Sequence, residues 1–512
     1  MLLSDVVAMN ARKHPNRTAL VFEGREMTFG ELHGRVCRVA NAMSELASPG
    51  DRVALIAENS AEYVECYYGV PAAGMVLSPL NYRLHAQEWA WILRDAEATV
   101  LIVQDKFLND IEGLLGEVPS LEHVLVLGGA AGRGSFADVV GAAPTSPPTT
   151  PVDEDASAWL MYTSGTTGFP KGAVLSHKNL MASAFSSVIE LELQPDERQY
   201  VSLPLCHIAG HAVVVAHVRG GCVVLATGFE PELWMRTVDE YQITAVAMVP
   251  TLLSMVLNHP QLPQHSLASL RTIGYGAAPM PLSVLRATIE RFGPIVYAGF
   301  GMTELGGVVL HLPKSAHVRA LNGEDHLLGS VGAAMCLADV KVVDENRVEC
   351  APGEVGEIVV RGDQVCTGYF RNAEGTAAAF SDGWFRTGDL ARADAEGHIF
   401  IVDRLKDMII TGGLNVYSRE VEEALYQHPA VLEAAVVGLP DPVWGENVTA
   451  AVVLRPGSTA TEEEIIAAVR GRLAGFKTPK RVVFTDELRK TATGKVMKHE
   501  LRRELEQAGE AR

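Results

Sequence analysis

Residues 162–172 read YTSGTTGFPKG, and this stretch indicates a loop that binds phosphate. It follows the apolar segment AWLM at residues 158–161, which is typical of a buried strand. Backbone amides, hydroxyl side chains and one lysine can together surround a triphosphate. A Walker A loop needs Gly-Lys and then Ser or Thr, whereas here Pro170 precedes the lysine and Gly172 follows it. The stretch therefore predicts a nucleotide-binding loop of another class.

Short runs rich in Val, Ile and Leu recur on both sides of this loop. They alternate with segments of helical spacing, such as residues 30–46 and 231–242, which predicts an α/β domain with buried, largely parallel strands. We expect more than one sheet. The apolar runs are residues 53–57, 100–103, 123–127, 201–205, 222–227 and 243–249.

The pattern changes twice towards the C-terminus. From about residue 339 alternating strands with turn signals indicate a small antiparallel β unit, and residues 404–512 have the strands and helices of a separate α+β domain. We therefore predict an N-terminal domain over 1–403, with α/β layers and the small β unit, and a C-terminal domain over 404–512. The Pro- and Thr-rich residues 141–157 are expected to form a surface loop that leads into the strand before the phosphate loop.

Composition excludes several classes of function. A formal net charge of −19 argues against nucleic acid or an anionic membrane as the main partner. The N-terminus lacks the features of a signal peptide, and no apolar run is long enough for a membrane segment, so we expect a cytoplasmic protein. Seven scattered cysteines without a Cys-x-x-Cys pair favour buried, reduced thiols.

The phosphate loop and five further motifs, in the same order, resemble those of the adenylate-forming superfamily, in its fatty-acid and 4-coumarate CoA ligase branch. The further motifs are GYGAAPM at 274–280, GFGMTE at 299–304, GWFRTGDL at 383–390, DRLKDMIITGGLNVYSREVEEAL at 403–425 and KTATGKVMK at 490–498. The resemblance covers nearly the whole chain. It implies an AMP-forming acid–thiol ligase, which converts a carboxylic acid to acyl-AMP and then to acyl-CoA, with ATP, CoA and the acid as substrates.

The resemblance also implies an ATP site. Glu304 corresponds to the carboxylate that binds Mg²⁺, Thr303 to a hydroxyl at the α-phosphate, and Lys495 to the lysine that bridges the acid and the α-phosphate. Asp389 is expected to bind the ribose hydroxyls, and Arg404 the ribose and phosphate. The β- and γ-phosphate contacts are expected from Thr163, Ser164, Gly165, Thr166, Thr167 and Lys171, and the adenine slot from Gly276, Ala277, Ala278, Pro279 and Phe300.

For the second half-reaction the resemblance implies a mobile C-terminal domain that rotates about a hinge at Lys406. Contacts to CoA are then expected from Gly412, Gly413, Trp444 and Phe476. Thr478 stands where an aryl-CoA relative has arginine, which puts a contact to the nucleotide phosphate of CoA in doubt. Lys477 or Lys480 is an alternative source of that contact.

The acid pocket is expected to be apolar and roomy, without a charged selector. His207 corresponds to a residue beside the path of the carboxylate, and the other predicted lining residues are small. This favours a fatty, alicyclic or simple aromatic acid over a dicarboxylate or an amino acid. The predicted lining is His207, Ala209, Ala212, Gly276, Gly299, Gly307 and Val308.

Other functions stay open at this point. The chain could load the pantetheine of a carrier protein or release acyl-AMP. An oxidative luciferase is a weaker alternative, because nothing in the sequence indicates its special substrate. A regulatory protein that only binds nucleotide is disfavoured, because Lys171, Glu304, Asp389 and Lys495 are all present. The sequence leaves the oligomeric state open, with a homodimer among the expectations.

Overall fold

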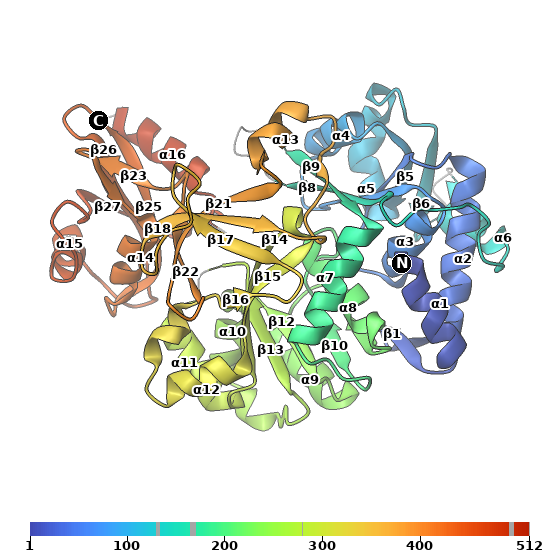
Figure 1. Cartoon of the computed structure of the whole chain (residues 1–512), viewed down its shortest axis with the longest axis horizontal. Coiled ribbons are helices and arrows are strands. Elements are labelled where there is room, and N and C mark those ends of the chain that lie inside the picture. Colours follow the sequence, from blue (N-terminus) through green and yellow to red (C-terminus); the bar gives the residue numbers. More distant parts are fainter. Residues whose placement is uncertain (130–133, 164–169, 279, 491–495, 511–512) are drawn as a thin grey trace.

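A mostly parallel sheet carries the strand that leads into the phosphate loop (Figure 1). The computed structural model describes residues 1–129, 134–163, 170–278, 280–490 and 496–510. The strand order is β19-β9-β8-β4-β3-β5-β6-β7, and β8–β9 and β9–β19 are antiparallel pairs. Its strands are β3 (Arg52–Ile56), β4 (Val76–Leu80), β5 (Ala98–Gln104), β6 (His123–Leu127), β7 (Gly134–Ser135), β8 (Ser157–Thr163), β9 (Lys171–Ser176) and β19 (Gly368–Tyr369).

A second sheet carries the other motifs of the N-terminal part, in the order β16-β15-β14-β13-β12-β10-β11-β1-β2. The neighbouring strands β14, β13, β12, β10, β11 and β1 run parallel. At the two edges of the sheet, β2, β15 and β16 form antiparallel pairs. Its strands are β1 (Thr18–Phe22), β2 (Arg25–Thr28), β10 (Arg198–Val201), β11 (Cys222–Leu225), β12 (Ala245–Met248), β13 (Thr272–Gly276), β14 (Val296–Met302), β15 (Gly307–Leu312) and β16 (Ala333–Ala334).

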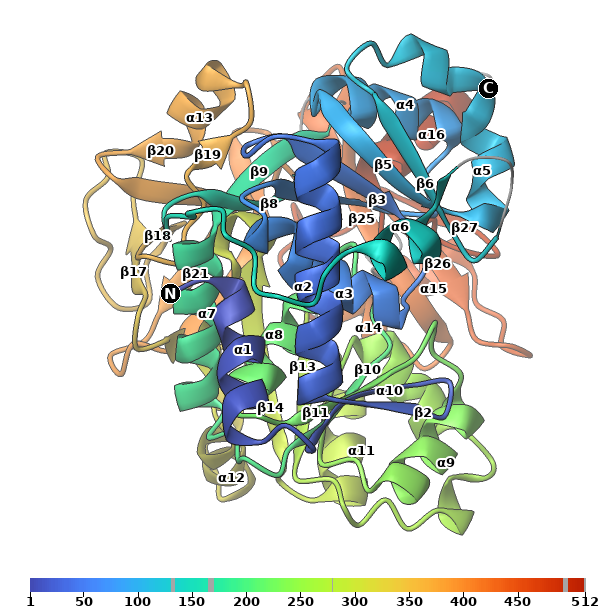
Figure 2. The same ribbon diagram turned by 90° about the vertical axis from the view of Figure 1, so that its right-hand side faces the viewer.

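Helices lie between these two sheets and on their outer faces (Figure 2). The inner helices share one core with both sheets, because Leu55 of β3 and Val223 of β11 belong to the same buried cluster. The inner helices are α1 (Leu3–Lys13), α2 (Phe29–Leu46), α3 (Ala61–Ala72), α7 (His177–Glu190) and α8 (Ala212–Val218). On the outer faces lie α4 (Ala86–Asp95) and α5 (Asp105–Ile111) for the first sheet, and α9 (Pro231–Tyr241), α10 (Pro250–Leu257), α11 (Leu282–Phe292) and α12 (Lys314–Leu321) for the second.

Local sequence explains where several of these helices begin. Thr28 caps α2 by accepting a hydrogen bond from the Glu31 amide, and the Glu31 carboxylate in turn accepts one from the Thr28 amide. Ser176 and Asn179 form the same reciprocal cap at the start of α7. The helix α6 (Phe136–Ala142) leads into the Pro- and Thr-rich loop, which Asn41 holds by bonds to the carbonyls of Pro144 and Ser146.

An antiparallel unit follows in the chain, as the sequence predicts. The strand order is β17-β18-β21-β20, with β22 also paired to β21 and α13 (Ala373–Ala379) beside them. The strands are β17 (Asp339–Val343), β18 (Val355–Arg361), β20 (Phe380–Ser381), β21 (Trp384–Ala393) and β22 (Ile399–Arg404).

The C-terminal part, coloured orange to red, lies at one end of the molecule (Figure 1). Its sheet has the order β24-β23-β26-β25, with β27 parallel to β26. The predicted α/β fold with a smaller α+β C-terminal part is confirmed, although the last helix was not predicted from the sequence. The elements are β23 (Ile409–Thr411), β24 (Leu414–Val416), α14 (Ser418–Tyr426), β25 (Val431–Asp441), β26 (Gly445–Leu454), α15 (Glu462–Arg470), β27 (Arg481–Phe484) and α16 (Lys498–Glu510).

Two local expectations are wrong. The apolar run 201–205 is not a strand, because β10 ends at Val201 and the chain turns before His207. Cys336 is exposed and Cys350 is half-buried, rather than buried as expected, although all seven cysteines are free thiols. In the described part of the chain, no helix combines the length and the apolar character needed to cross a membrane.

Candidate active site

The strands β8 and β9 hold the two ends of the phosphate loop beside each other. Thr163 is the last residue of β8 and pairs with Lys171, the first residue of β9. The loop therefore connects two antiparallel strands, and its basic residue lies across from a hydroxyl. The loop residues Ser164, Gly165, Thr166 and Thr167 lie outside the described residues.

Glu304 lies at this end of the hairpin, although it comes from a distant motif. It sits in the short helix η4 (Thr303–Leu305) directly after β14, and 5% of it is exposed. The hydroxyls of Thr163 and Tyr369 both donate to Oε1 of Glu304, each over 3.1 Å. The structure thus brings together Thr163 and Glu304, which the sequence predicts as site residues, and orients the carboxylate from two sides.

Tyr369 completes this cluster, and the sequence analysis missed it. Its ring lies beneath the ammonium group of Lys171, with Nζ 5.1 Å from the ring centroid. Burial, and then the charge of Glu304, raise the pKa of the Tyr369 hydroxyl, so it stays a proton donor at neutral pH. Tyr369 reaches the site because β19 pairs with β9, a contact that no sequence spacing indicates.

Asp389 and Arg404, the predicted ribose contacts, form a pair of their own. They are opposite each other on β21 and β22, and Arg404 Nε lies 2.9 Å from Asp389 Oδ1. Asp389 is 4% exposed. A buried carboxylate fixed by an arginine is suited to accept hydrogen bonds from a polar ligand.

The predicted adenine slot lies where β13 and β14 end. Gly276 is opposite Gly299, and a Cβ at Gly276 would collide with the Gly299 carbonyl oxygen. Ala277 has a φ of 63°, a strained conformation for a residue with a side chain, which often marks functional sites. Ala278 follows it, Phe300 is half-buried on β14, and Pro279 lies outside the described residues.

Polar groups lie at and beside the predicted lining residues of the acid pocket. Burial, and then the charge of Arg83, lower the pKa of His207 to about 4, so its ring is neutral at pH 7. Ala209 and Ala212 follow in the helix η2 (Ile208–His211) and at the start of α8. Ser183 and His211 place polar atoms beside Gly307, so the residues next to this predicted lining position are not all apolar. None of the six sequence motifs contains either residue, because Ser183 lies on α7 and His211 on η2.

The C-terminal part places the predicted CoA contacts on its surface. Gly412 and Gly413 adopt left-handed conformations, and the Gly412 amide donates to the Trp444 carbonyl over 2.8 Å. The side chains of Trp444 and Phe476 are exposed. Lys406 lies in the turn after β22, between the small β unit and the C-terminal sheet.

The structure distinguishes Lys477 from Lys480, the two alternative contacts to the nucleotide phosphate of CoA. Thr478 is 1% exposed, so its side chain is not available to a phosphate. Lys477 donates to both carboxylate oxygens of Glu420, at 2.8 and 2.7 Å, whereas Lys480 is exposed. Lys495 lies outside the described residues.

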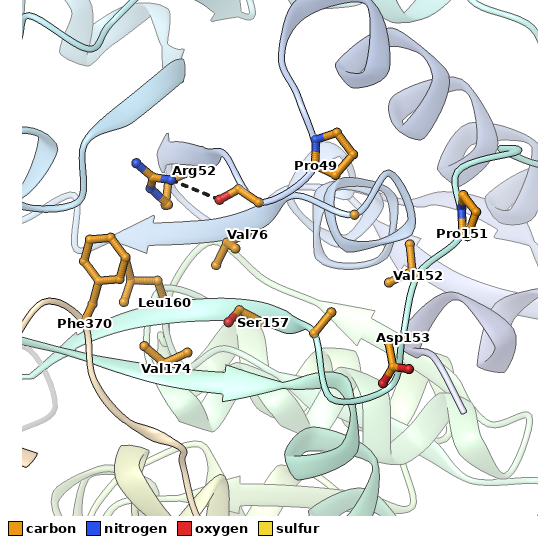
Figure 3. A pocket seen from close by; sticks show the side chains of 13 residues that line it. Pro49, Arg52, Val76, Pro151, Val152, Asp153, Ser157, Leu160, Val174 and Phe370 are labelled. Atoms are coloured by element: carbon orange, nitrogen blue, oxygen red, sulfur yellow. Dashed lines mark hydrogen bonds between the residues drawn. The ribbon is translucent and has the colours of Figure 1, made fainter.

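A separate cavity of about 360 Å³ lies where β4 and β8 diverge (Figure 3). Phe370 and Leu160 lie at one end of the cavity, Asp153 lies at the other, and Val76 and Ser157 lie between them. None of the predicted site residues lines this cavity.

Comparison with protein-family models settles the family. The model described as AMP-binding enzyme matches residues 7–370, and the model described as AMP-binding enzyme C-terminal domain matches residues 420–495. This chain belongs to the AMP-binding enzyme family. The resemblance to adenylate-forming enzymes is therefore confirmed, and with it the prediction of an AMP-forming acyl-CoA synthetase.

Individual relatives of this AMP-binding enzyme cover almost its full length. A feruloyl-CoA synthase from an Amycolatopsis species is 40% identical over 96% of this chain and 97% of that protein. A medium/long-chain-fatty-acid–CoA ligase from Mycobacterium tuberculosis is 35% identical over 98% of this chain and 90% of that protein. The crystal structure of an anthranilate CoA ligase in complex with anthranoyl-AMP matches with a TM-score of 0.90 and 30% identity, covering 99% of this chain and 98% of that one.

Proposed function

We propose that this enzyme activates an aromatic carboxylic acid with Mg·ATP and transfers the acyl group from the adenylate to CoA. The arrangement that carries the proposal is the cluster of Thr163, Lys171 and Glu304 at the mouth of the phosphate loop. The preference for an aromatic acid rests on two of the relatives described above, whose names refer to feruloyl-CoA and anthranoyl-AMP.

Glu304 fits a Mg²⁺ site of the kind that serves nucleotide chemistry. Magnesium usually takes one or two carboxylates and keeps waters and phosphate oxygens as its other ligands. Thr163 and Tyr369 occupy Oε1 of Glu304, and no described residue hydrogen-bonds to Oε2. The described residues contain no cluster of His, Cys, Asp or Glu that would hold a metal by itself, which suits an ion bound together with ATP. When bound, the ion neutralises phosphate charge.

The remaining residues hold the reactants in place. Lys171 and the phosphate loop bind the β- and γ-phosphates, and Thr303 contacts the α-phosphate. The Asp389 carboxylate accepts hydrogen bonds from the ribose hydroxyls, while Arg404 holds this carboxylate in place. Lys495 stabilises the charge that develops as the acid attacks the α-phosphorus and pyrophosphate departs.

The C-terminal domain, residues 404–512, then rotates about Lys406 to admit CoA. The turn at Gly412 and Gly413, with the exposed rings of Trp444 and Phe476, forms the pantetheine channel. Lys480 contacts the nucleotide phosphate of CoA, because Lys477 is already paired with Glu420. The thiol attacks the acyl carbon, and AMP leaves.

An acid panel tests this proposal. Pyrophosphate release is measured for cinnamate, 4-hydroxycinnamate, benzoate, octanoate and hexadecanoate, with CoA, without CoA, and with a phosphopantetheinylated carrier protein. We expect kcat/KM for the best aromatic acid to exceed that for either fatty acid by at least tenfold, and thioester to form on CoA. A preference for the fatty acids would contradict the aromatic assignment, and acylation of the carrier protein alone would contradict CoA as the acceptor.

A further inference from the structure

Gly307, one of the predicted lining residues of the acid pocket, lies beside two polar side chains. It is the first residue of β15 and has a φ of +130°, a conformation that favours glycine. A Cβ at this position would lie 3.2 Å from Ser183 Oγ and 3.9 Å from His211 Nδ1. A hydroxyl and an imidazole nitrogen therefore both lie close to the backbone of Gly307.

Ser183 is a buried hydroxyl without a protein partner. It lies on α7, its exposed fraction is 0%, and Oγ makes no hydrogen bond to any residue that the structure describes. Burial of an unpaired hydroxyl is unfavourable, because the bond to water is lost and nothing replaces it. A ligand oxygen in the pocket would restore that bond.

His211 supplies a hydrogen-bond acceptor at the same place. Its Nε2 lies 2.9 Å from the Leu180 carbonyl oxygen, which can only accept, so Nε2 carries the proton. Burial lowers the pKa of His211 to about 4, which keeps the ring neutral at pH 7. Nδ1 therefore has a free lone pair, and it is the ring atom that faces Gly307.

The surfaces around these two polar atoms are aromatic and aliphatic. The Trp159 ring meets His211 edge-on, with 6.0 Å between ring centroids. Val308 lies against Gly299, where a Cβ would be 3.2 Å from Cγ1. Apolar side chains thus lie beside one buried donor and one buried acceptor.

We propose that Ser183 and His211 recognise a hydroxyl group on the ring of an aromatic acid. The ligand hydroxyl donates to His211 Nδ1 and accepts from Ser183 Oγ, so both buried groups become paired. This inference rests on the proposed function, since it assumes that the acid is aromatic. An acid without the hydroxyl would leave both groups unpaired, which is a strong basis for discrimination.

The test compares acids that differ by one hydroxyl. The kcat/KM for thioester formation is measured with cinnamate, 3-hydroxycinnamate and 4-hydroxycinnamate. We expect the wild-type enzyme to prefer one hydroxylated acid over cinnamate by at least about tenfold, because an unpaired buried polar group costs about that much. Ser183→Ala should reduce this preference about tenfold, through lower activity on the hydroxylated acid.

A matched control comes from the same helix. Ser186 is also fully buried, but its hydroxyl lies 3.7 Å from the Cys336 sulfur. Ser186→Ala should leave the preference unchanged. His211→Leu provides a second variant, which should also lose the preference, with thermal unfolding measured to confirm that it folds.

The possible failures are distinguishable. Equal use of cinnamate and both hydroxycinnamates by the wild-type enzyme would contradict the recognition of a hydroxyl, while the proposed function would stand. An unchanged preference in Ser183→Ala would also contradict it. If no aromatic acid yields pyrophosphate, the proposed function itself fails.

Discussion

At the scale of single residues, two neighbouring hydroxyl groups orient the carboxylate of Glu304, which we propose binds Mg²⁺. Two hydroxyls from separate strands donate to the same oxygen, and Tyr369 also supplies the ring beneath Lys171. Groups that orient a metal-binding carboxylate typically contribute ten- to a hundredfold to metal affinity. The arrangement therefore predicts that Tyr369 tunes the magnesium requirement without touching the acid.

The substitution Tyr369→Phe tests this role, because it removes the hydroxyl and keeps the ring beneath Lys171. We expect the Mg²⁺ concentration for half-maximal pyrophosphate release to rise about tenfold. Tyr426→Phe is the control, since that hydroxyl lies on α14 and bonds the Ala434 carbonyl instead. An unchanged magnesium requirement in Tyr369→Phe would show that the hydroxyl does not orient Glu304.

At the scale of elements, glycines set how closely β13, β14 and β15 approach. A Cβ at Gly276 would collide with the carbonyl oxygen of Gly299, and one at Gly301 with the carbonyl oxygen of Gly307. The obstacles are backbone atoms, which cannot rotate away as a side chain can. The strands that carry the adenine and acid motifs therefore depend on glycine for their spacing.

Gly276→Ala should separate β13 from β14. We expect the free energy of unfolding to fall by about 1–3 kcal/mol and the KM for ATP to rise, because the proposed adenine slot lies at this strand end. Gly228→Ala is the matched control, since a Cβ there meets open space, and its effect should stay within about 0.5 kcal/mol. Urea unfolding followed by tryptophan fluorescence measures the free energy of unfolding of both variants. Equal unfolding midpoints for Gly276→Ala and Gly228→Ala would contradict the spacing argument.

At the scale of the whole molecule, buried charges join the two parts of the chain beside the proposed hinge. Asp403, at the end of β22, accepts hydrogen bonds from the amide and hydroxyl of Ser418 on α14. Lys498 of α16 donates to Ser418 Oγ over 2.6 Å and pairs with Glu422 at 2.7 Å. These contacts fix how the C-terminal part sits in this structure, a few residues from Lys406.

How much the sequence predicts depends on how local each feature is. The convergence of Thr163 and Glu304 was predictable, because each belongs to a continuous motif at a strand end. Tyr369, Ser183 and His211 were not, because strand pairing and helix packing bring them in from positions with no informative spacing. The run 201–205 resembled a strand by composition, but tertiary structure turned it into a loop that positions His207.

The central claim is that one chain forms an acyl adenylate and then passes the acyl group to CoA. Its most direct test uses an acid labelled with oxygen-18 in the carboxylate, with ATP, Mg²⁺ and CoA, and mass spectrometry of the products. If the carboxylate attacks the α-phosphorus and the thiol then displaces AMP, one labelled oxygen stays on AMP. Unlabelled acid in oxygen-18 water should leave AMP unlabelled. Thioester formed together with unlabelled AMP, or label in pyrophosphate, would contradict the account.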